Sequence, residues 1–309
     1  MKMPYAARCK NLTGIYGPIS EPGSAEWLQT MSASKVAAVL GLSPYMSRFT
    51  LWHQMNGTAP RQATTDVMRR GHYLEPAVAA WFADQHPSWK IVRTGTWTDA
   101  GAPWATASPD RLALVPREGA RLVEIKTASH SDEWGAAGTD QIPAGYRAQV
   151  MWSLMVTGAT VAHVAVLLPF LEFREYVVRF DAEEASYIAS AAFHFMESLR
   201  LGDAPPLDGA DSTYQTVRAL HPEIDGTDVE VPLGAATDFL YCKGVLSDAE
   251  LLERNSRADM LTRMGNAKRA VCNGVTIATR TPGRNGGTPY LSYPRTLPML
   301  GALTTEVSA

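Results

Sequence analysis

Residues 108–126 read SPDRLALVPREGARLVEIK, and this stretch decides the fold that we expect for the chain. A run of apolar residues at 112–115 and a second apolar group, Leu122, Val123 and Ile125, flank a short segment that contains proline and glycine. This order predicts a strand, a turn and a second strand. The hairpin would fold Asp110 back beside Glu124.

The second strand of this hairpin has an unusual distribution of charge. Side chains alternate faces along a strand, so Glu124 and Lys126 point to one side while Ile125 points into the core. A Glu-x-Lys pair on a strand is most often a solvated face. Together with Asp110, however, it could hold a hard divalent cation through oxygen ligands and keep an ammonium group beside a water molecule. That is the chemistry of metal-assisted phosphodiester cleavage.

Two further polar residues lie on predicted helices. Glu75 stands near the start of a helix opened by Gly71–Pro76, where it is either a third carboxylate of the cluster or a first-turn acid favoured by the helix dipole. Gln149 lies on an amphipathic helix that follows the Glu124 strand. It either reaches back toward the cluster or faces solvent.

A short helix is predicted upstream, over residues 31–41. Ser32 and Ser34 stand at its start and Gly41 ends it, as expected for a well-capped helix. Hydroxyls and free N–H groups at a helix start are also suited to a phosphate.

The order of these motifs resembles the phage-type recombination exonucleases, the lambda-exonuclease or YqaJ-like branch of the PD-(D/E)xK nucleases. The resemblance covers about residues 25–200. It is carried by Ser32 and Ser34, Gly41 to Tyr45, Leu51-Trp52, Gly71 to Pro76, Ser108 to Asp110, Glu124 to Lys126, and Tyr146 to Gln149.

The resemblance implies an α/β fold, a PD-(D/E)xK restriction-endonuclease-like core with a mixed central sheet flanked by helices. It also implies a Mg²⁺-dependent enzyme, with Mn²⁺ as a possible substitute, that digests linear double-stranded DNA from the 5′ end and leaves 3′ single-stranded overhangs for viral or phage recombination. The implied metal ligands are Glu75, Asp110, Glu124 and the Ile125 carbonyl. Lys126 would orient or activate the water, with Gln149 in support. Ser32, Ser34 and Ser108 match positions around the terminal phosphate of the DNA.

The chain departs from this pattern in its arginines. Similar enzymes often carry an arginine shortly before the serine-rich helix, and residues 26–30 contain none. Arg48 or Arg8 would have to contact the phosphate instead. A preference for a 5′-phosphorylated end therefore has less support than cleavage itself.

The composition of the chain argues against certain classes of protein and certain metal sites. The formal net charge is -3, which argues against a protein that coats DNA nonspecifically. Basic residues gather over 254–295, where eight Lys or Arg stand against Asp259 alone. This segment is either a DNA-facing or subunit-facing patch or a solvated face. The three cysteines, Cys9, Cys242 and Cys272, exclude a Cys₄ cluster, and the seven histidines show no paired metal-site spacing.

The predicted elements divide the chain into a nuclease core over 1–203 and a C-terminal helical and hairpin extension over 204–309. The division falls at the Gly-Asp-Ala-Pro-Pro segment that begins at Gly202. In the core we expect helices to about residue 86, followed by alternating strands and helices that end in a long helix capped by Asp181. In the extension we expect an irregular stretch, a helix and a hairpin. The expected strands of the core are 89–98, 104–115, 121–127, 161–168 and 174–180, and its later helices are 144–157 and 181–201. In the extension, the irregular stretch covers 207–235, the helix 236–270, and the hairpin 274–280 with 288–293.

Two other functions stay open from the residues. A structure-selective or restriction-type endonuclease of the same superfamily would share Asp110, Glu124 and Lys126, and a non-catalytic DNA-binding protein could keep the fold. The partners implied by the resemblance are double-stranded DNA ends, a single-strand annealing protein and further copies in a homo-oligomeric ring. No signal-peptide pattern and no apolar run near twenty residues occurs, so we expect a soluble protein without membrane contact, in the cytoplasm or, for a viral protein, the host cytoplasm.

Overall fold

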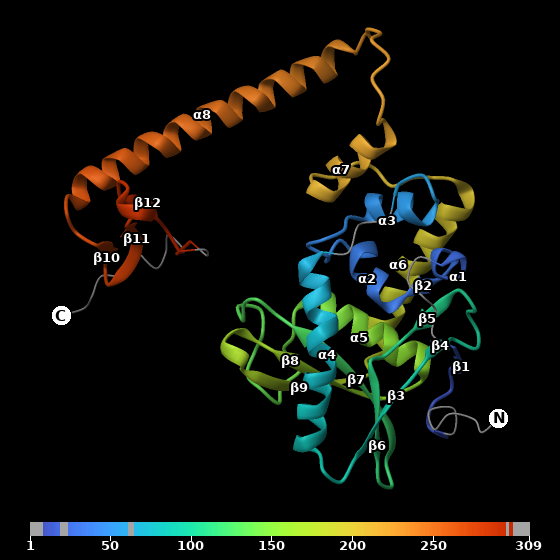
Figure 1. Cartoon of the computed structure of the whole chain (residues 1–309). Helices are drawn as coiled ribbons and strands as arrows, with labels where there is room; N and C mark the ends of the chain where they lie inside the picture. The colour runs from blue at the N-terminus through green and yellow to red at the C-terminus, as the bar shows by residue number, and fades with distance from the viewer. Residues whose placement is uncertain (1–8, 19–23, 61–64, 295–296, 299–309) are drawn as a thin grey trace. The chain divides into compact units, whose positions relative to one another are not determined.

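The computed structural model describes residues 9–18, 24–60, 65–294 and 297–298. The chain forms two compact units, Met1–Ile224 and Asp225–Ala309 (Figure 1). Arg8 and Arg295 lie outside the described residues.

The first unit is built on a five-stranded sheet in the order β3-β6-β7-β8-β9. Its strands are β3 (Lys90–Arg93), β6 (Arg111–Val115), β7 (Gly119–Thr127), β8 (Val161–Leu167) and β9 (Phe173–Arg179). The neighbours β7 and β8 are parallel and every other pair is antiparallel. A parallel pair needs a crossover connection, and α5 (Ala144–Thr157) provides it. The expected α/β core with a mixed central sheet is confirmed.

Helices cover both faces of this sheet, as Figure 1 shows for α4 (Asp66–Gln85). On the α4 side, Phe82 packs with Val123 and Ile125 in one apolar cluster. On the other side, Leu122 packs with residues of α5 in a second and larger cluster. The alternation of odd and even residues along β7 therefore divides the two cores, and it sends Glu124 toward α5.

A smaller sheet and four helices complete the packing around this core. The strands, in sheet order, are β1 (Ile15–Gly17), β4 (Thr96–Thr98), β5 (Ala105–Ala107) and β2 (Met31–Ser32), and the helices are α1 (Ala25–Gln29), α2 (Ala33–Val39), α3 (Arg48–Met55) and α6 (Ala182–Leu201); a 3-10 turn, η2 (Pro169–Leu171), precedes β9. The predicted cap of α6 is confirmed, because Asp181 accepts hydrogen bonds from the backbone N–H groups of Glu183 and Glu184.

Several expectations for the first unit need correction. Helix α4 begins after Thr65, whose hydroxyl accepts from the Met68 N–H, so Glu75 lies in mid-helix and not in a first turn. The helix tolerates Pro76 in its interior. The strands expected over 89–98 and 104–115 are each broken in two, and their pieces belong to different sheets.

A further correction concerns α2, which we expected to be well capped. Ser32 is its N-cap residue but makes no side-chain capping hydrogen bond. Its hydroxyl lies 3.2 Å from the Ser34 hydroxyl instead.

Residues 207–235, expected to be irregular, contain helix α7 (Asp211–Leu220). Hydroxyl groups join it to α3: the Ser47 N–H donates to the Ser212 hydroxyl at 2.9 Å, and the Thr50 and Thr216 hydroxyls lie 2.9 Å apart. These contacts explain why the first compact unit extends to Ile224. The functional boundary after residue 203 stays a prediction.

The second unit consists of one long helix followed by a three-stranded antiparallel sheet (Figure 1). Its elements are α8 (Leu233–Met264), β10 (Arg269–Cys272), β11 (Val275–Thr281), the 3-10 turn η3 (Arg284–Gly286) and β12 (Tyr290–Ser292). The predicted hairpin is confirmed as β11 and β12. The predicted helix over 236–270 ends early, because Gly265 adopts a positive φ of 51° at its C-cap.

Within the part of the chain that the structure describes, no helix combines the length and apolar character that spanning a membrane requires.

Candidate active site

The hairpin of β6 and β7 brings Asp110 beside the Glu124–Lys126 segment, as its sequence predicts. Arg111 pairs with Val123, so Asp110 stands just before β6 at the level of Glu124. The Asp110 Oδ2 atom accepts a hydrogen bond of 2.7 Å from the Ile125 N–H. The Lys126 Nζ atom lies 2.6 Å from Glu124 Oε1, and the Glu124 side chain is only 6% exposed. The pair is therefore a buried ion pair and not a solvated strand face.

Gln149 reaches back to this pair from α5. Its Nε2 atom donates to Glu124 Oε1 at 2.5 Å, and its Oε1 atom accepts from Lys126 Nζ at 3.1 Å. One amide thus satisfies both members of the ion pair, which fixes their orientation. The solvent-facing alternative for Gln149 is wrong.

Glu75 lies at the edge of the same cluster, held by an arginine that sequence reasoning missed. Arg111 Nη1 donates to Glu75 Oε1 at 2.7 Å and to the backbone carbonyl of Asp110 at 2.6 Å. The Glu75 side chain is 30% exposed and the Arg111 side chain 10%. Arg111 therefore ties α4 to the start of β6, so that the Glu75 carboxylate stays close to Asp110.

Crowding of carboxylates shifts the ionisation of the cluster. Burial and the neighbouring Glu124 raise the pKa of Asp110 to about 7, against the opposing effects of Lys126 and the Ile125 N–H. Burial alone would lower the pKa of Lys126, but Glu124 and Asp110 together raise it above its ordinary value. Lys126 is consequently an ammonium ion at neutral pH, whereas Asp110 is only partly ionised there.

The cluster opens into a cleft with a volume of about 460 Å³. Glu75, Asp110 and Gln149 line one part of it, and the predicted serines Ser32, Ser34 and Ser108 line it too. Because the serines come from α2 and from the segment after β5, the fold gathers hydroxyls and carboxylates that are far apart in sequence.

Arg48 does not lie where we expected it, and another arginine, Arg93, lines the cleft instead. Arg48 is not among the residues that line the cleft, and its guanidinium lies 5.7 Å from the centre of the Phe195 ring. Arg93, at the end of β3, does line the cleft. It stands directly opposite Arg111 in the sheet register, and no carboxylate in the described part of the chain forms an ion pair with it. The register between β3 and β6 is non-local, so the sequence offered no signal for this placement.

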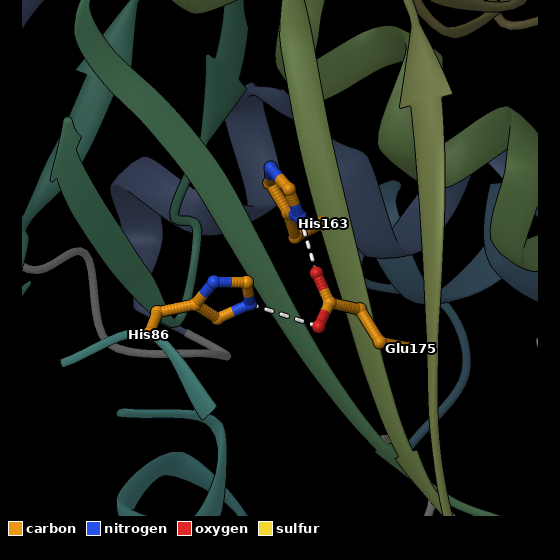
Figure 2. Close-up of side chains that lie close together, drawn as sticks. All are labelled: His86, His163 and Glu175. Carbon is orange, nitrogen blue, oxygen red and sulfur yellow. Dashed lines mark hydrogen bonds and ion pairs between the residues drawn. The ribbon is translucent and has the colours of Figure 1, made fainter. Parts of the chain in front are cut away.

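A second cluster of titratable groups lies on the α4 side of the sheet. Figure 2 shows the Glu175 carboxylate between the rings of His86 and His163, with one oxygen toward each. The distances are 2.6 Å from Oε1 to His163 Nδ1 and 2.9 Å from Oε2 to His86 Nε2. These three groups are close enough to suggest a metal site.

The hydrogen bonds of His163 favour a different interpretation. Arg121 Nη1 lies 3.2 Å from His163 Nε2, and a guanidinium only donates, so Nε2 must accept. Nδ1 then carries the proton and donates to Glu175. A metal on Nδ1 would place the proton on Nε2, and that N–H group would then face the N–H donor of Arg121. We therefore interpret the cluster as a closed hydrogen-bonded connection between the end of α4 and strands β8 and β9.

Comparison with solved structures gives low but consistent similarity. An alkaline exonuclease, LHK-Exo, from Laribacter hongkongensis is 19% identical, with a TM-score of 0.48 over 60% of this chain and 94% of its own. A phage-related exonuclease from Haemophilus somnus 129PT is 12% identical, with a TM-score of 0.42 over 56% of this chain and 96% of its own. No curated protein sequence matches the chain.

The family comparison is specific to one part of the chain. The sequence model of the YqaJ-like viral recombinase domain matches residues 26–160, a span that contains the hairpin of β6 and β7, the cleft-lining serines and Gln149. Residues 26–160 of the first unit are therefore similar to the YqaJ-like viral recombinase domain.

Proposed function

We propose that this cleft is the active site of a metal-dependent deoxyribonuclease that digests one strand of linear duplex DNA from its 5′ end. The observation that carries the proposal is the buried Glu124–Lys126 ion pair, held by Gln149 and lying next to Asp110, beside a cleft that Glu75, Asp110 and Gln149 line. Clustered carboxylates repel a phosphodiester unless a cation overcompensates their charge. The YqaJ-like domain supports the same class of activity.

The donor set fits a hard divalent cation. Glu75, Asp110, Glu124 and the Ile125 carbonyl would supply oxygen ligands, the kind that Mg²⁺ and Mn²⁺ prefer. Burial and the neighbouring Glu124 carboxylate raise the pKa of Asp110, and a bound cation would oppose both effects. When bound, it would polarise the phosphodiester and favour ionisation of a water molecule.

The roles of the protein groups follow from their contacts. Lys126 is protonated beside Glu124, so in this state it serves as a hydrogen-bond donor and positive charge for the attacking water or the phosphate, and not as a base. Gln149 fixes the orientation of the Lys126 and Glu124 side chains through two hydrogen bonds. Both side chains are positioned before substrate enters, which lowers the reorganisation needed during reaction.

The hydroxyl side of the cleft suits a terminal phosphate. Ser32, Ser34 and Ser108 offer donors there, and Arg93 is the cation that we assign to it in place of Arg48. Arg93 and Arg111 stand opposite one another on neighbouring strands, and like charges in such pairs are destabilising. Glu75 already balances the charge of Arg111, and a bound phosphate would balance that of Arg93.

The products of this reaction define its partners. Digestion from a 5′ end leaves a 3′ single strand, the substrate that a single-strand annealing protein would take in recombination. We further propose that the enzyme works as a homo-oligomeric ring around the duplex, as the resemblance implies.

The test compares digestion of linear and covalently closed duplex DNA, with Mg²⁺, with Mn²⁺ and with EDTA. The key variant is Lys126→Met, which removes the ammonium at similar length, and Lys90→Met on β3 is the matched control outside the cleft. We expect metal-dependent loss of the linear DNA only, reduced about 100-fold or more in Lys126→Met and unchanged in Lys90→Met. Cutting of the closed circle would make the protein an endonuclease, and no cleavage with either metal would leave only DNA binding.

A further inference from the structure

The sheet of the second unit has an unusual charge. Residues 260–293 contain Arg263, Lys268, Arg269, Arg280 and Arg284, and no Asp or Glu. A segment of this size with five basic residues and no acidic residue favours a polyanion as its binding partner. The formal net charge of the whole chain is nevertheless -3, because acidic residues elsewhere in the chain outnumber these basic residues.

The sheet register sorts these residues between two faces. Ala278 and Leu291 pack with Met264 of α8 and form a small core on one face. The opposite face carries a cross-strand row in which Arg269 pairs with Thr279 and Thr279 pairs with Ser292. Arg269 is exposed, and the two hydroxyl residues are half-buried. We call this the outer face of β10–β12.

An aromatic ring and two further cations adjoin the row. Tyr290 pairs with Thr281 on the same face and is 51% exposed. Lys268 directly precedes β10 and Arg284 lies in the turn between β11 and β12, both exposed. Within the described residues, no carboxylate forms an ion pair with Lys268, Arg269 or Arg284, whereas Arg263 is paired with Asp259. Three cations are thus available to an external anion.

We propose that the outer face of β10–β12 is a second DNA-binding surface, separate from the cleft. Its cations contact backbone phosphates, and Tyr290 gives an unpaired base a ring to stack on. Exposed cations interleaved with hydroxyls and an aromatic residue are the groups by which proteins bind a DNA strand without reading its sequence. The inference rests on the proposed DNA substrate, but it concerns affinity and not cleavage.

The test measures binding of the full-length protein in EDTA, where no cleavage occurs. Fluorescence anisotropy of a labelled single strand and of the matching blunt duplex is followed against NaCl concentration. The double variant Lys268→Gln/Arg269→Gln removes the charge of Arg269 on the outer face and that of Lys268, which directly precedes β10. Its matched control, Lys243→Gln/Arg257→Gln, removes two charges from α8 in the same unit.

We expect the outer-face variant to bind about tenfold more weakly and to lose about 0.7–0.9 of salt slope for each phosphate contact removed. The control should change affinity less than about twofold. Equal weakening in both variants would reduce the effect to net charge, and no weakening in either would exclude the surface; both results overturn the inference.

A second variant identifies the form of DNA. Tyr290→Ser should weaken binding of the single strand about fivefold or more and spare the duplex, because only unpaired bases stack on a side chain. Tyr241→Ser on α8, 71% exposed, is its control. Weakening by the charge variant alone would assign the surface to duplex backbone and still support it. Protection of backbone amides in 268–292 from hydrogen exchange upon DNA addition gives a readout that misfolding of a variant does not disturb.

Cleavage assays separate this inference from the proposed function. The outer-face variant should retain the cleavage rate at saturating DNA while its KM rises. A wild-type protein that binds DNA through the outer face but never cleaves would refute the proposed function and leave the second surface standing.

Discussion

Asp110 is a proposed metal ligand, a role that requires its ionised form. Its surroundings, however, disfavour the ionised carboxylate at neutral pH. Its pKa of about 7 compares with an ordinary value of 3.8. The folded chain therefore holds the proton more tightly than the unfolded chain between these values. The stabilising contribution is complete below pH 3.8 and is lost as the pH rises through about 7.

This sign leads to a stability prediction for Asp110→Asn. In EDTA, the variant should gain thermal stability relative to wild type as the pH rises from about 5 to about 8, because the amide stays neutral. A gain of several degrees is expected, since about 1 kcal/mol moves Tm by roughly 2–4 °C in a domain of this size. Mg²⁺ should raise the Tm of the wild type at the higher pH and leave the variant nearly unchanged. A pH-independent difference between the two proteins would contradict the assignment.

The arginines give a second prediction at the scale of single residues. Arg93→Gln should lower digestion of 5′-phosphorylated linear DNA about tenfold or more and should bring it close to the rate on a 5′-hydroxyl end, because a charge-assisted contact is lost. Arg48→Gln, whose side chain does not line the cleft, is the control and should keep the preference. Loss of the preference in Arg48→Gln alone would restore the original assignment. Rates on both ends, measured for the three proteins, decide it.

Alternation along β7 was enough to predict that Asp110, Glu124 and Lys126 meet, since these residues belong to one hairpin. Arg93 and Arg111 were not predictable as cleft residues. Their position depends on the pairing of β3 with β6 and on contact with α4, and such long-range register leaves no local trace in the sequence.

At the scale of elements, α4 is fixed at two points along its length. Arg111 holds Glu75 near its middle, and Glu175 holds His86 at its C-terminal end. Burial would raise the pKa of Glu175, but its hydrogen bonds to His163 and His86 lower it below 4.5. Its stabilising contribution is thus present above that value and is lost as the pH falls through the lowered pKa.

Removing this charge should loosen the end of α4. Glu175→Gln is expected to lose about 2 kcal/mol of unfolding free energy at neutral pH, because two charge-assisted hydrogen bonds are weakened. Glu172→Gln, which breaks the exposed ion pair with Arg174, should cost less than about 1 kcal/mol. Urea denaturation measures both. Stabilisation of the wild type by micromolar Zn²⁺, absent in Glu175→Gln, would instead show that the cluster is a metal site.

Elements with strong local signals were predictable and those shaped by packing were not. The caps around α6 and the length of α5 follow from the sequence, and the structure confirms both. The mid-helix position of Glu75 was missed because Gly71 and Pro76 are poor helix residues, and α4 tolerates them through its packing on the sheet. Helix α7 was missed because its stability comes from hydroxyl contacts with α3.

For the whole molecule, the two units predict a pattern of limited proteolysis. Residues 221–232 are exposed and form no helix or strand, so a protease should cut there first. The N-terminal fragment should keep α7, because Ser212 and Thr216 bind α3. Mass spectrometry of the early fragments identifies the cut. A first cut at 202–210 would favour the boundary predicted after residue 203.

Helix α8 is the longest helix in the described part of the chain. Its 32 residues extend about 48 Å, close to the length of 14 base pairs. If the outer face of β10–β12 binds a strand as proposed, the covalent link between the two units would keep that strand at high effective concentration for recapture after its release from the cleft. Oligonucleotides too short to engage both surfaces would lack this advantage, and processivity would appear only above a threshold of substrate length.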